Sequence, residues 1–181
     1  LVEKTLALLH EKPSTSLLEL GTGSGAVVLA LAKERPHGSF WACDKYKETL
    51  DVARDNAKRL NLKRVNFILS DWFESIPSYR FDAIISNPPY LAEDDPHQHL
   101  GDLRFEPKHA LISGQEGLDD IRHIIKTAPN FLKPQGFLML EHGFDQGPMI
   151  KTLFETHQYT KISSFYDIEN RMRITTGFRQ D

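Results

Sequence analysis

The sequence predicts an α/β domain whose sheet is mostly parallel, covered by helices on both faces and closed by an antiparallel hairpin. Three observations predict this fold class. Strand-like and helix-like segments alternate along the chain as far as His142. Each of these strands is an almost continuous apolar run, which is typical of parallel strands buried on both faces. Near the end of the chain, two strand-like runs flank the polar segment 169–171, and this pattern predicts a hairpin.

The individual elements follow in chain order. Val2, Leu6 and Leu9 recur at helical spacing, and Pro13 ends that first helix. We expect five strands at 16–20, 39–44, 65–70, 81–86 and 137–142, and a hairpin of strands 161–168 and 171–178. We expect further helices at 26–35, 48–60, 118–132 and near 148–157, and a polar loop over 91–109. No repeat or linker divides the chain, so we expect a single domain over residues 1–181.

Composition and charge limit the classes of function. Of the 181 residues, 40% are hydrophobic and 26% are charged, as in an ordinary globular domain. The net charge of -3 gives no overall attraction to a phosphate backbone, so we expect no direct nucleic-acid binding. The longest apolar run, 26–32, is too short to span a bilayer, and we expect no membrane partner.

The cysteine content and the start of the chain bear on location. The lone Cys43 cannot form an internal disulfide, which is compatible with a reducing compartment. A basic segment followed by a cleavage site is not seen at the start. We therefore expect a soluble cytoplasmic protein. Because the chain begins without methionine and inside a helix-like pattern, we also expect it to be a fragment of a longer protein.

A glycine-rich turn follows the first predicted strand. Gly21, Gly23 and Gly25 lack a Cβ, so a ligand can approach their backbone closely. Many α/β domains use such a turn only to join a strand to a helix, but this turn lies at the sheet edge where ligands bind. Its G-x-G-x-G spacing differs from the G-x-G-x-x-G of dinucleotide sites. Glu19, just before the turn, would repel a pyrophosphate and suits a cationic ligand.

Polar and aromatic residues follow the next two strands. Asp44 ends the second strand, where a carboxylate can accept hydrogen bonds from both hydroxyls of a ribose, or can simply cap the next helix. Asp71 and Trp72 follow the third strand. An adenine can stack on the indole while a carboxylate or a backbone group accepts a hydrogen bond from its amino group, although Trp72 taken alone is almost as well explained as a core aromatic. Together with the glycine turn, these residues predict a pocket for an adenosine ligand.

The fourth strand ends in Asn87-Pro88-Pro89-Tyr90. The two prolines stiffen the backbone, and the Asn87 side chain and the Pro88 carbonyl are both hydrogen-bond acceptors. Two acceptors on a rigid backbone fit one planar NH2 group. A rigid turn without function is the alternative, and the position at the end of a strand favours function. We call residues 87–90 the elbow.

These motifs, in this order, resemble those of a known enzyme family. "ELGTGSG", the acid at Asp44, "SDWF" and "SNPPY" are similar to the motifs of class I S-adenosylmethionine-dependent methyltransferases that modify planar nitrogens. With "GDLRFEP" and "LEHG", the whole chain resembles the HemK/PrmC family, which methylates the glutamine of the GGQ motif in peptide chain release factors. N-P-P-Y is shared with adenine-N6 and cytosine-N4 DNA methyltransferases, so it indicates the chemistry better than the substrate.

The resemblance implies a Rossmann-like fold with a seven-stranded sheet, and a reaction. A methyl group from S-adenosyl-L-methionine would pass to the N5 amide nitrogen of the glutamine, leaving S-adenosyl-L-homocysteine, with class 1 release factors as partners. We predict catalytic roles for Asn87, Pro88, Pro89 and Tyr90. We predict cofactor contacts from Glu19, Gly21, Thr22, Gly23, Ser24, Gly25, Asp44, Lys45, Asp71, Trp72 and Asn87.

The chain departs from the family in two respects. The resemblance implies an N-terminal helical domain that helps to dock the release factor, and we expect residues 1–181 to be the catalytic domain without it. Tyr46 stands where relatives often have a small hydroxyl residue, which removes a potential helix cap.

Several alternatives stay open. A DNA-base methyltransferase shares the chemistry but would need a basic groove, and a scaffold that binds cofactor without catalysis is a third reading. Arg104 and Glu106 can shape the substrate entrance or form surface ion pairs. We expect no metal site, because the acids and histidines of the same loop lack a metal-ligand spacing. These residues are Asp94, Asp95, His97 and His99.

Overall fold

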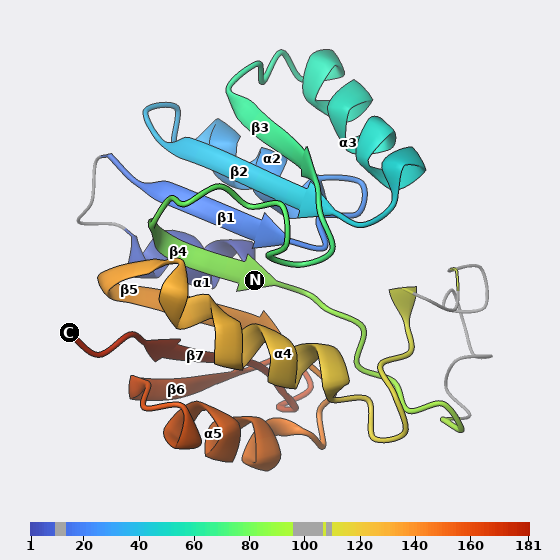
Figure 1. Cartoon of the computed structure of the whole chain (residues 1–181), viewed down its shortest axis with the longest axis vertical. Helices are drawn as coiled ribbons and strands as arrows, with labels where there is room; N and C mark the ends of the chain where they lie inside the picture. Colours follow the sequence, from blue (N-terminus) through green and yellow to red (C-terminus); the bar gives the residue numbers. More distant parts are fainter. Residues whose placement is uncertain (10–13, 96–106, 108–109) are drawn as a thin grey trace.

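The computed structural model describes residues 1–9, 14–95, 107 and 110–181 (Figure 1). Its strands are β1 (Ser16–Leu20), β2 (Ser39–Asp44), β3 (Val65–Leu69), β4 (Phe81–Ser86), β5 (Leu132–Glu141), β6 (Thr160–Tyr166) and β7 (Met172–Phe178). Its α-helices are α1 (Val2–Leu8), α2 (Ala26–Glu34), α3 (Lys47–Arg59), α4 (Asp119–Thr127) and α5 (Gly147–Thr156). A short 3-10 helix, η4 (Ala128–Asn130), follows α4.

The strands form one seven-stranded sheet in the order β3-β2-β1-β4-β5-β7-β6. The first five strands in this order are parallel, and β7 and β6 are antiparallel to their neighbours. The predicted fold class and its C-terminal hairpin are therefore confirmed. The chain leaves β1 in one direction along the sheet and returns to β4 on the other side of β1. This reversal is where ligands bind in open α/β sheets, beyond the carboxyl ends of the strands.

Two apolar layers hold the helices against the sheet, because alternate side chains of each strand point to opposite faces. Leu18, Ile84 and Leu138 face a core that includes buried isoleucines of α4 and Ile150 of α5. Side chains on the other face, including Leu17, Ala83 and Ile85, pack against α1, α2 and α3. The predicted helices on both faces are confirmed (Figure 1).

The start of the fifth strand differs from the prediction. The expected helix 118–132 ends at Thr127, and β5 begins at Leu132 instead of residue 137. Leu132 pairs with Phe81, and the β4–β5 register then shifts before Ala83 pairs with Phe137. This irregularity accommodates Pro134, which has no N–H to donate to a regular ladder. Proline and glycine inside the strand therefore made it look like a loop.

The predicted loop 91–109 is described only in part. Leu91 forms an isolated parallel bridge with Ile112, and its N–H donates to the carbonyl of Leu111 over 2.8 Å. Pro13, His97, His99, Arg104 and Glu106 lie outside the described residues, so their predicted roles are not tested. Within the described ranges, no group of histidine, cysteine and acidic residues is arranged to hold a metal ion. None of the helices in those ranges has the length and apolarity needed to cross a membrane.

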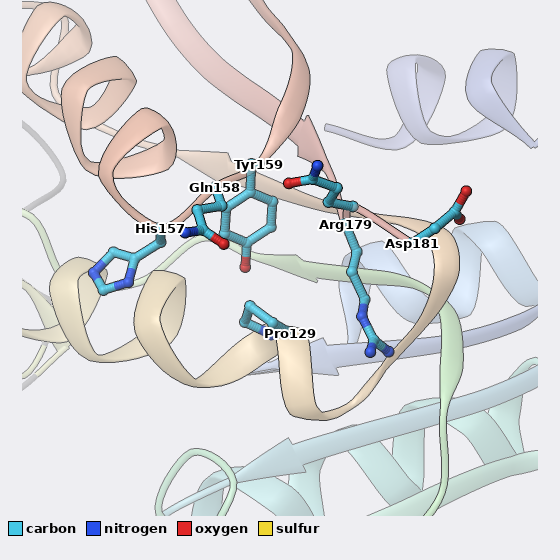
Figure 2. Close-up of a pocket in the computed structure, with 7 residues that line it drawn as sticks. Pro129, His157, Gln158, Tyr159, Arg179 and Asp181 are labelled. Carbon is cyan, nitrogen blue, oxygen red and sulfur yellow. The ribbon is translucent and has the colours of Figure 1, made fainter.

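Two hollows lie at the amino-terminal edge of the parallel strands. One of about 210 Å³ is lined by residues that include Pro129, Tyr159 and Arg179 (Figure 2). The hydroxyl of Tyr159 donates to the carbonyl of Ile125 over 3.0 Å, so this side chain serves the packing of α4. The other hollow, of about 590 Å³, lies where α2 and α3 end. Neither hollow contains a predicted site residue.

Candidate functional site

The glycine turn after β1 provides an open cradle. Gly21 and Gly23 have φ of 64° and 57°, in the left-handed region that favours glycine. A Cβ at Gly23 would meet no atom within 4 Å, so the space above this residue is open to a ligand. A Cβ at Gly21 would lie 3.4 Å from the ring of Trp72. The turn is therefore open at Gly23 and bounded by an aromatic ring at Gly21.

Glu19 supports the turn from inside the protein. Its Oε2 accepts hydrogen bonds from Thr22 Oγ1 over 2.5 Å and from the N–H of Val28, in the first turn of α2, over 3.1 Å. Burial raises the pKa of Glu19 to about 8, and the negative charge of nearby Asp44 adds to this effect. The two hydrogen bonds act in the opposite direction and lower the pKa, but burial has the larger effect. The carboxyl therefore holds a proton at neutral pH, and a cation bound next to it would favour the charged form. Ser24, which follows in the turn, is exposed.

Asp44 connects the end of β2 to the glycine turn. Its Oδ2 accepts from the N–H of Gly23, and its Oδ1 accepts from the N–H of Tyr46, each over 3.0 Å. Tyr46 is the N-cap residue of α3 and makes no side-chain cap hydrogen bond, so Asp44 supplies a contact there. A carboxylate has about four lone-pair sites, so two remain for a ligand. Asp44 thus contacts the N-cap residue of α3 and does not cap the amides of its first turn, and the carboxylate keeps lone pairs that can accept from a ribose.

The residues after β3 lie beside the glycine turn. Trp72 is partly buried against the core, and its Nε1–H donates to Asp120 Oδ1 over 2.9 Å. Asp71 forms an ion pair with Lys45 over 2.5 Å. The indole is thus both a core aromatic and a wall of the glycine turn. Sequence reasoning missed Asp120, whose only local signal is its place in the acidic first turn of α4.

The elbow leaves the strand next to β1. Leu20 and Ser86 are register partners, and Ser86 Oγ donates to the carbonyl of Leu20 over 2.9 Å. Gly21 and Asn87 therefore begin side by side at the carboxyl edge of the sheet. The side chain of Asn87 is exposed and makes no hydrogen bond within the described part of the chain, while Pro88 is buried. The structure thus brings the predicted acceptor group next to the predicted cofactor pocket.

Tyr90 completes the elbow and is half-buried against the core layer that contains α4 and α5. Pro89 is also half-buried. Asp94 and Asp95 follow in the outer loop, where the N–H of Asp95 donates to the carbonyl of Ala92 over 3.1 Å. The elbow is therefore packed on one side and open at Asn87.

Two buried groups near this edge are not available for chemistry. His142, of the "LEHG" segment, is fully buried between the carbonyl of Gly143 (2.8 Å from Nδ1) and Thr175 Oγ1 (2.9 Å from Nε2). Because a carbonyl only accepts, Nδ1 carries the hydrogen, and burial lowers the pKa of His142 so that the ring stays neutral. Burial, followed by nearby acids, raises the pKa of the Cys43 thiol to about 12. Neither side chain is a candidate acid, base or nucleophile.

Comparisons with known proteins agree with this arrangement. A family described as "Methyltransferase domain" matches residues 11–175. The release factor glutamine methyltransferase of Xylella fastidiosa (strain 9a5c) is 46% identical over 177 residues, covering 98% of this chain and 64% of the relative. The enzyme of the same name from Escherichia coli (strain K12) is 42% identical over 177 residues with the same coverage. The chain therefore spans slightly less than two thirds of the length of these relatives.

Solved structures share the fold. The crystal structure of a methyltransferase from Pyrococcus furiosus superimposes with a TM-score of 0.71 over 99% of this chain and 83% of that chain. The two sequences are 18% identical. At this identity the likeness shows the common fold and nothing about the substrate.

Proposed function

Because the chain belongs to the methyltransferase domain family, we propose that it transfers a methyl group from S-adenosyl-L-methionine to the side-chain amide nitrogen of the GGQ glutamine in class 1 peptide chain release factors. The main observation behind the proposal is the pairing of Leu20 with Ser86 at the ends of β1 and β4. Because these two residues are neighbours, the glycine turn and the elbow that follow them begin side by side. The names of the two curated relatives support the glutamine of a release factor as the acceptor. A cytoplasmic location, where release factors work, is part of this proposal.

The residues at the glycine turn fit this cofactor. Gly23 leaves open space next to the backbone, and Trp72 offers an apolar wall beside it. Glu19, Asp44 and Asp71 all lie near enough to Cys43 to raise the pKa of its thiol, so three carboxyl groups gather at this edge. The cationic sulfonium and amino groups of S-adenosyl-L-methionine, bound at this edge, would favour the charged form of the Glu19 carboxyl, whereas a pyrophosphate would not. We assign the remaining cofactor contacts to Thr22, Ser24, Gly25 and Lys45.

The elbow would hold the acceptor. The Asn87 side-chain oxygen and the Pro88 carbonyl each accept one N–H of the glutamine amide, and the ring of Tyr90 stacks on its plane. An amide nitrogen is a weak nucleophile, because its lone pair is delocalised into the carbonyl. Acceptors fixed in advance favour the pyramidal nitrogen of the transition state and stabilise the positive charge that develops on it. Holding the reacting atoms about 3–3.5 Å apart contributes through positioning alone.

The atoms of the reaction balance without a general base. When bound, S-adenosyl-L-methionine supplies a methyl group on a positively charged sulfur. The nitrogen lone pair forms the new N–C bond as the C–S bond breaks, and the amide then releases one proton to water. Asn87 and Pro88 hold the two hydrogens until that release. A neutral, buried His142 is consistent with a site that needs no imidazole base.

The test of this function uses two acceptors and a control without acceptor in parallel. The chain is incubated with tritiated S-adenosyl-L-methionine and an unmethylated release factor, duplex DNA or neither, and the tryptic GGQ peptide is examined by mass spectrometry. We expect label and a 14 Da increase on the glutamine only. Label on DNA would support a DNA-base methyltransferase, and cofactor binding without label on either acceptor would support a scaffold. Either result overturns the proposal.

The role of the elbow is tested by Asn87→Ala. We expect kcat to fall about 10²–10³-fold, the effect of removing one preorganised group from a transition state, while the affinity for S-adenosyl-L-homocysteine falls far less, because the glycine turn supplies most of the predicted cofactor contacts. Asn130→Ala is the matched control, because Asn130 is exposed at the end of η4, at the opposite edge. Full activity of Asn87→Ala would remove Asn87 from the mechanism.

A further inference from the structure

The side-chain amide of Gln146 forms hydrogen bonds with three segments of the chain, one of which is the elbow. Its Nε2 donates to the carbonyl of Tyr90 over 2.9 Å and to the carbonyl of Gly117 over 3.2 Å, and it lies 3.5 Å from the carbonyl of Glu116. Its Oε1 accepts from the N–H of Gly143 over 2.9 Å. One side chain, at the N-cap of α5, thus connects the elbow to the segments that precede α4 and follow β5.

The elbow depends on such contacts because it has few donors of its own. Pro88 and Pro89 carry no N–H, so the four residues offer only two backbone donors. At its entry the elbow is fixed by Ser86, which is paired with Leu20 and Leu140 inside the sheet. At its exit, the carbonyl of Tyr90 is the group that Gln146 holds. Fixing both ends leaves little freedom to the stiff residues between them.

The backbones of Tyr90 and Gly117 lie close together, and the side-chain amide of Gln146 donates hydrogen bonds to the carbonyls of both residues. A Cβ at Gly117 would lie 2.3 Å from the carbonyl oxygen of Tyr90, and Gly117 has φ of 68°, so only glycine permits this approach. The carbonyls of Tyr90 and Gly117 both accept hydrogen bonds and cannot bond to each other. The NH2 group of Gln146 donates to both, which makes their close approach favourable.

We propose that Gln146 is a positioning residue for methyl transfer, which sets the position of the elbow by holding the Tyr90 carbonyl. The role assigned to the elbow rests on the function proposed above. Gln146 holds the elbow through backbone atoms, and none of its hydrogen bonds in the described structure reaches the glycine turn. Its removal should therefore change turnover and leave cofactor binding intact.

Three variants separate this role from a general loss of stability. Gln146→Glu keeps the shape and the acceptor for Gly143, but turns an oxygen toward the two carbonyls that the amide held. Gln146→Ala removes all the contacts. Gln180→Ala is the matched control, because Gln180 is exposed at the opposite edge of the sheet. The measurements are kcat and KM for methyl transfer, affinity for S-adenosyl-L-homocysteine, and hydrogen exchange of the backbone amides.

We expect kcat of Gln146→Glu and Gln146→Ala to fall about tenfold to a hundredfold, as for a reacting group displaced by about 1 Å, with unchanged cofactor affinity. Amides of Leu91, Glu93 and Ser113, which hold the exit of the elbow, should exchange faster, and those of α2 should not. Activity of Gln146→Glu relative to the parent chain should rise as the pH falls, because a protonated carboxyl can again donate to Tyr90. Gln146→Ala should show no such recovery.

The outcomes distinguish this proposal from the proposed function. Unchanged exchange at Leu91 and Glu93, or parallel losses of cofactor affinity and turnover without recovery at low pH, would overturn the positioning role. If the parent chain methylates no release factor but the amides of Leu91, Glu93 and Ser113 exchange faster in Gln146→Glu, the proposed function fails. The inference that Gln146 fixes the position of the elbow then still stands. Loss of turnover in Gln180→Ala to the same degree would also contradict the inference.

Discussion

Asp44 Oδ2 and the N–H of Gly23 are joined by a 3.0 Å hydrogen bond, which ties the end of β2 to the glycine turn after β1. The other carboxylate oxygen accepts from Tyr46, at the start of α3. One buried side chain therefore fixes the turn and the beginning of a helix together. The shape of the glycine turn, where we propose that the cofactor binds, therefore depends on this link.

Replacing Asp44 tests that link. We expect Asp44→Ala to weaken binding of S-adenosyl-L-homocysteine at least about tenfold, since hydrogen bonds to a charged group contribute about 1.5–3 kcal/mol. Isothermal titration calorimetry measures the affinity. Asp55→Ala is the control, because Asp55 forms only an exposed ion pair with Lys58. Equal affinities of the parent chain and Asp44→Ala would show that the pocket does not use this carboxylate.

Glu19 makes the stability of the ligand-free protein depend on pH. Its pKa is about 8 in the folded state and near 4.5 in the unfolded chain, so between these values the folded state binds one more proton. The protonated Glu19 carboxyl therefore contributes its full stabilisation below pH 4.5. Between pH 4.5 and about 8 the free energy of unfolding falls by about 1.4 kcal/mol per pH unit, because the unfolded chain has already lost this proton. We expect Glu19→Gln to flatten this decline in urea unfolding measured from pH 5 to 8. Parallel pH profiles of the two proteins would contradict the prediction.

Trp72 should report ligand binding by its fluorescence. The chain has two tryptophans, and only Trp72 borders the glycine turn, whereas Trp41 stacks on Tyr79 with ring centroids 5.7 Å apart. We expect S-adenosyl-L-homocysteine to change the emission of the parent chain and of Trp41→Phe, but not that of Trp72→Phe. A persistent change in Trp72→Phe would place the ligand away from the indole.

Substitutions at two glycines should affect cofactor binding and the position of the elbow separately. Gly23→Ala has steric room but a positive φ, so it should cost about 1–2 kcal/mol of stability and place a methyl group in the ligand space. Gly117→Ala adds a clash with the Tyr90 carbonyl and should lower kcat with little change in cofactor affinity. Calorimetry and steady-state kinetics on both variants check the contrast. The same pattern in both variants would mean that the two regions are not independent.

Much of the fold could be predicted because its local signals are clear. The bounds of β1, β2 and β4 match the prediction, since each is an apolar run with a glycine, a charged residue or a proline near its end. The prediction for the start of β5 was wrong, because Pro134 and Gly136 resemble a loop locally. Only the pairing of Leu132 with Phe81, which are far apart in sequence, makes residues 132–136 part of a strand. Register of this kind has no local signal.

The same distinction holds for the candidate site. Gly23, Asp44 and Asn87 could be placed at one edge because parallel strands present their carboxyl ends together. Asp120 and Gln146 come from α4 and α5, and their contacts with Trp72 and Tyr90 depend on how those helices pack. Nothing in the neighbouring sequence indicates these partners. The common edge that these residues share was therefore predictable, and the side chains that contact Trp72 and Tyr90 from α4 and α5 were not.

The burial of Cys43 has a practical consequence. The chain has no other thiol, and this one is inaccessible and stays protonated in neutral solution, so maleimides and methanethiosulfonates should leave the folded protein unmodified. A cysteine introduced at Ile168, which is fully exposed, would then take a spin label or a dye at that position alone. Site-specific spectroscopy on residues 1–181 can therefore begin without first replacing Cys43.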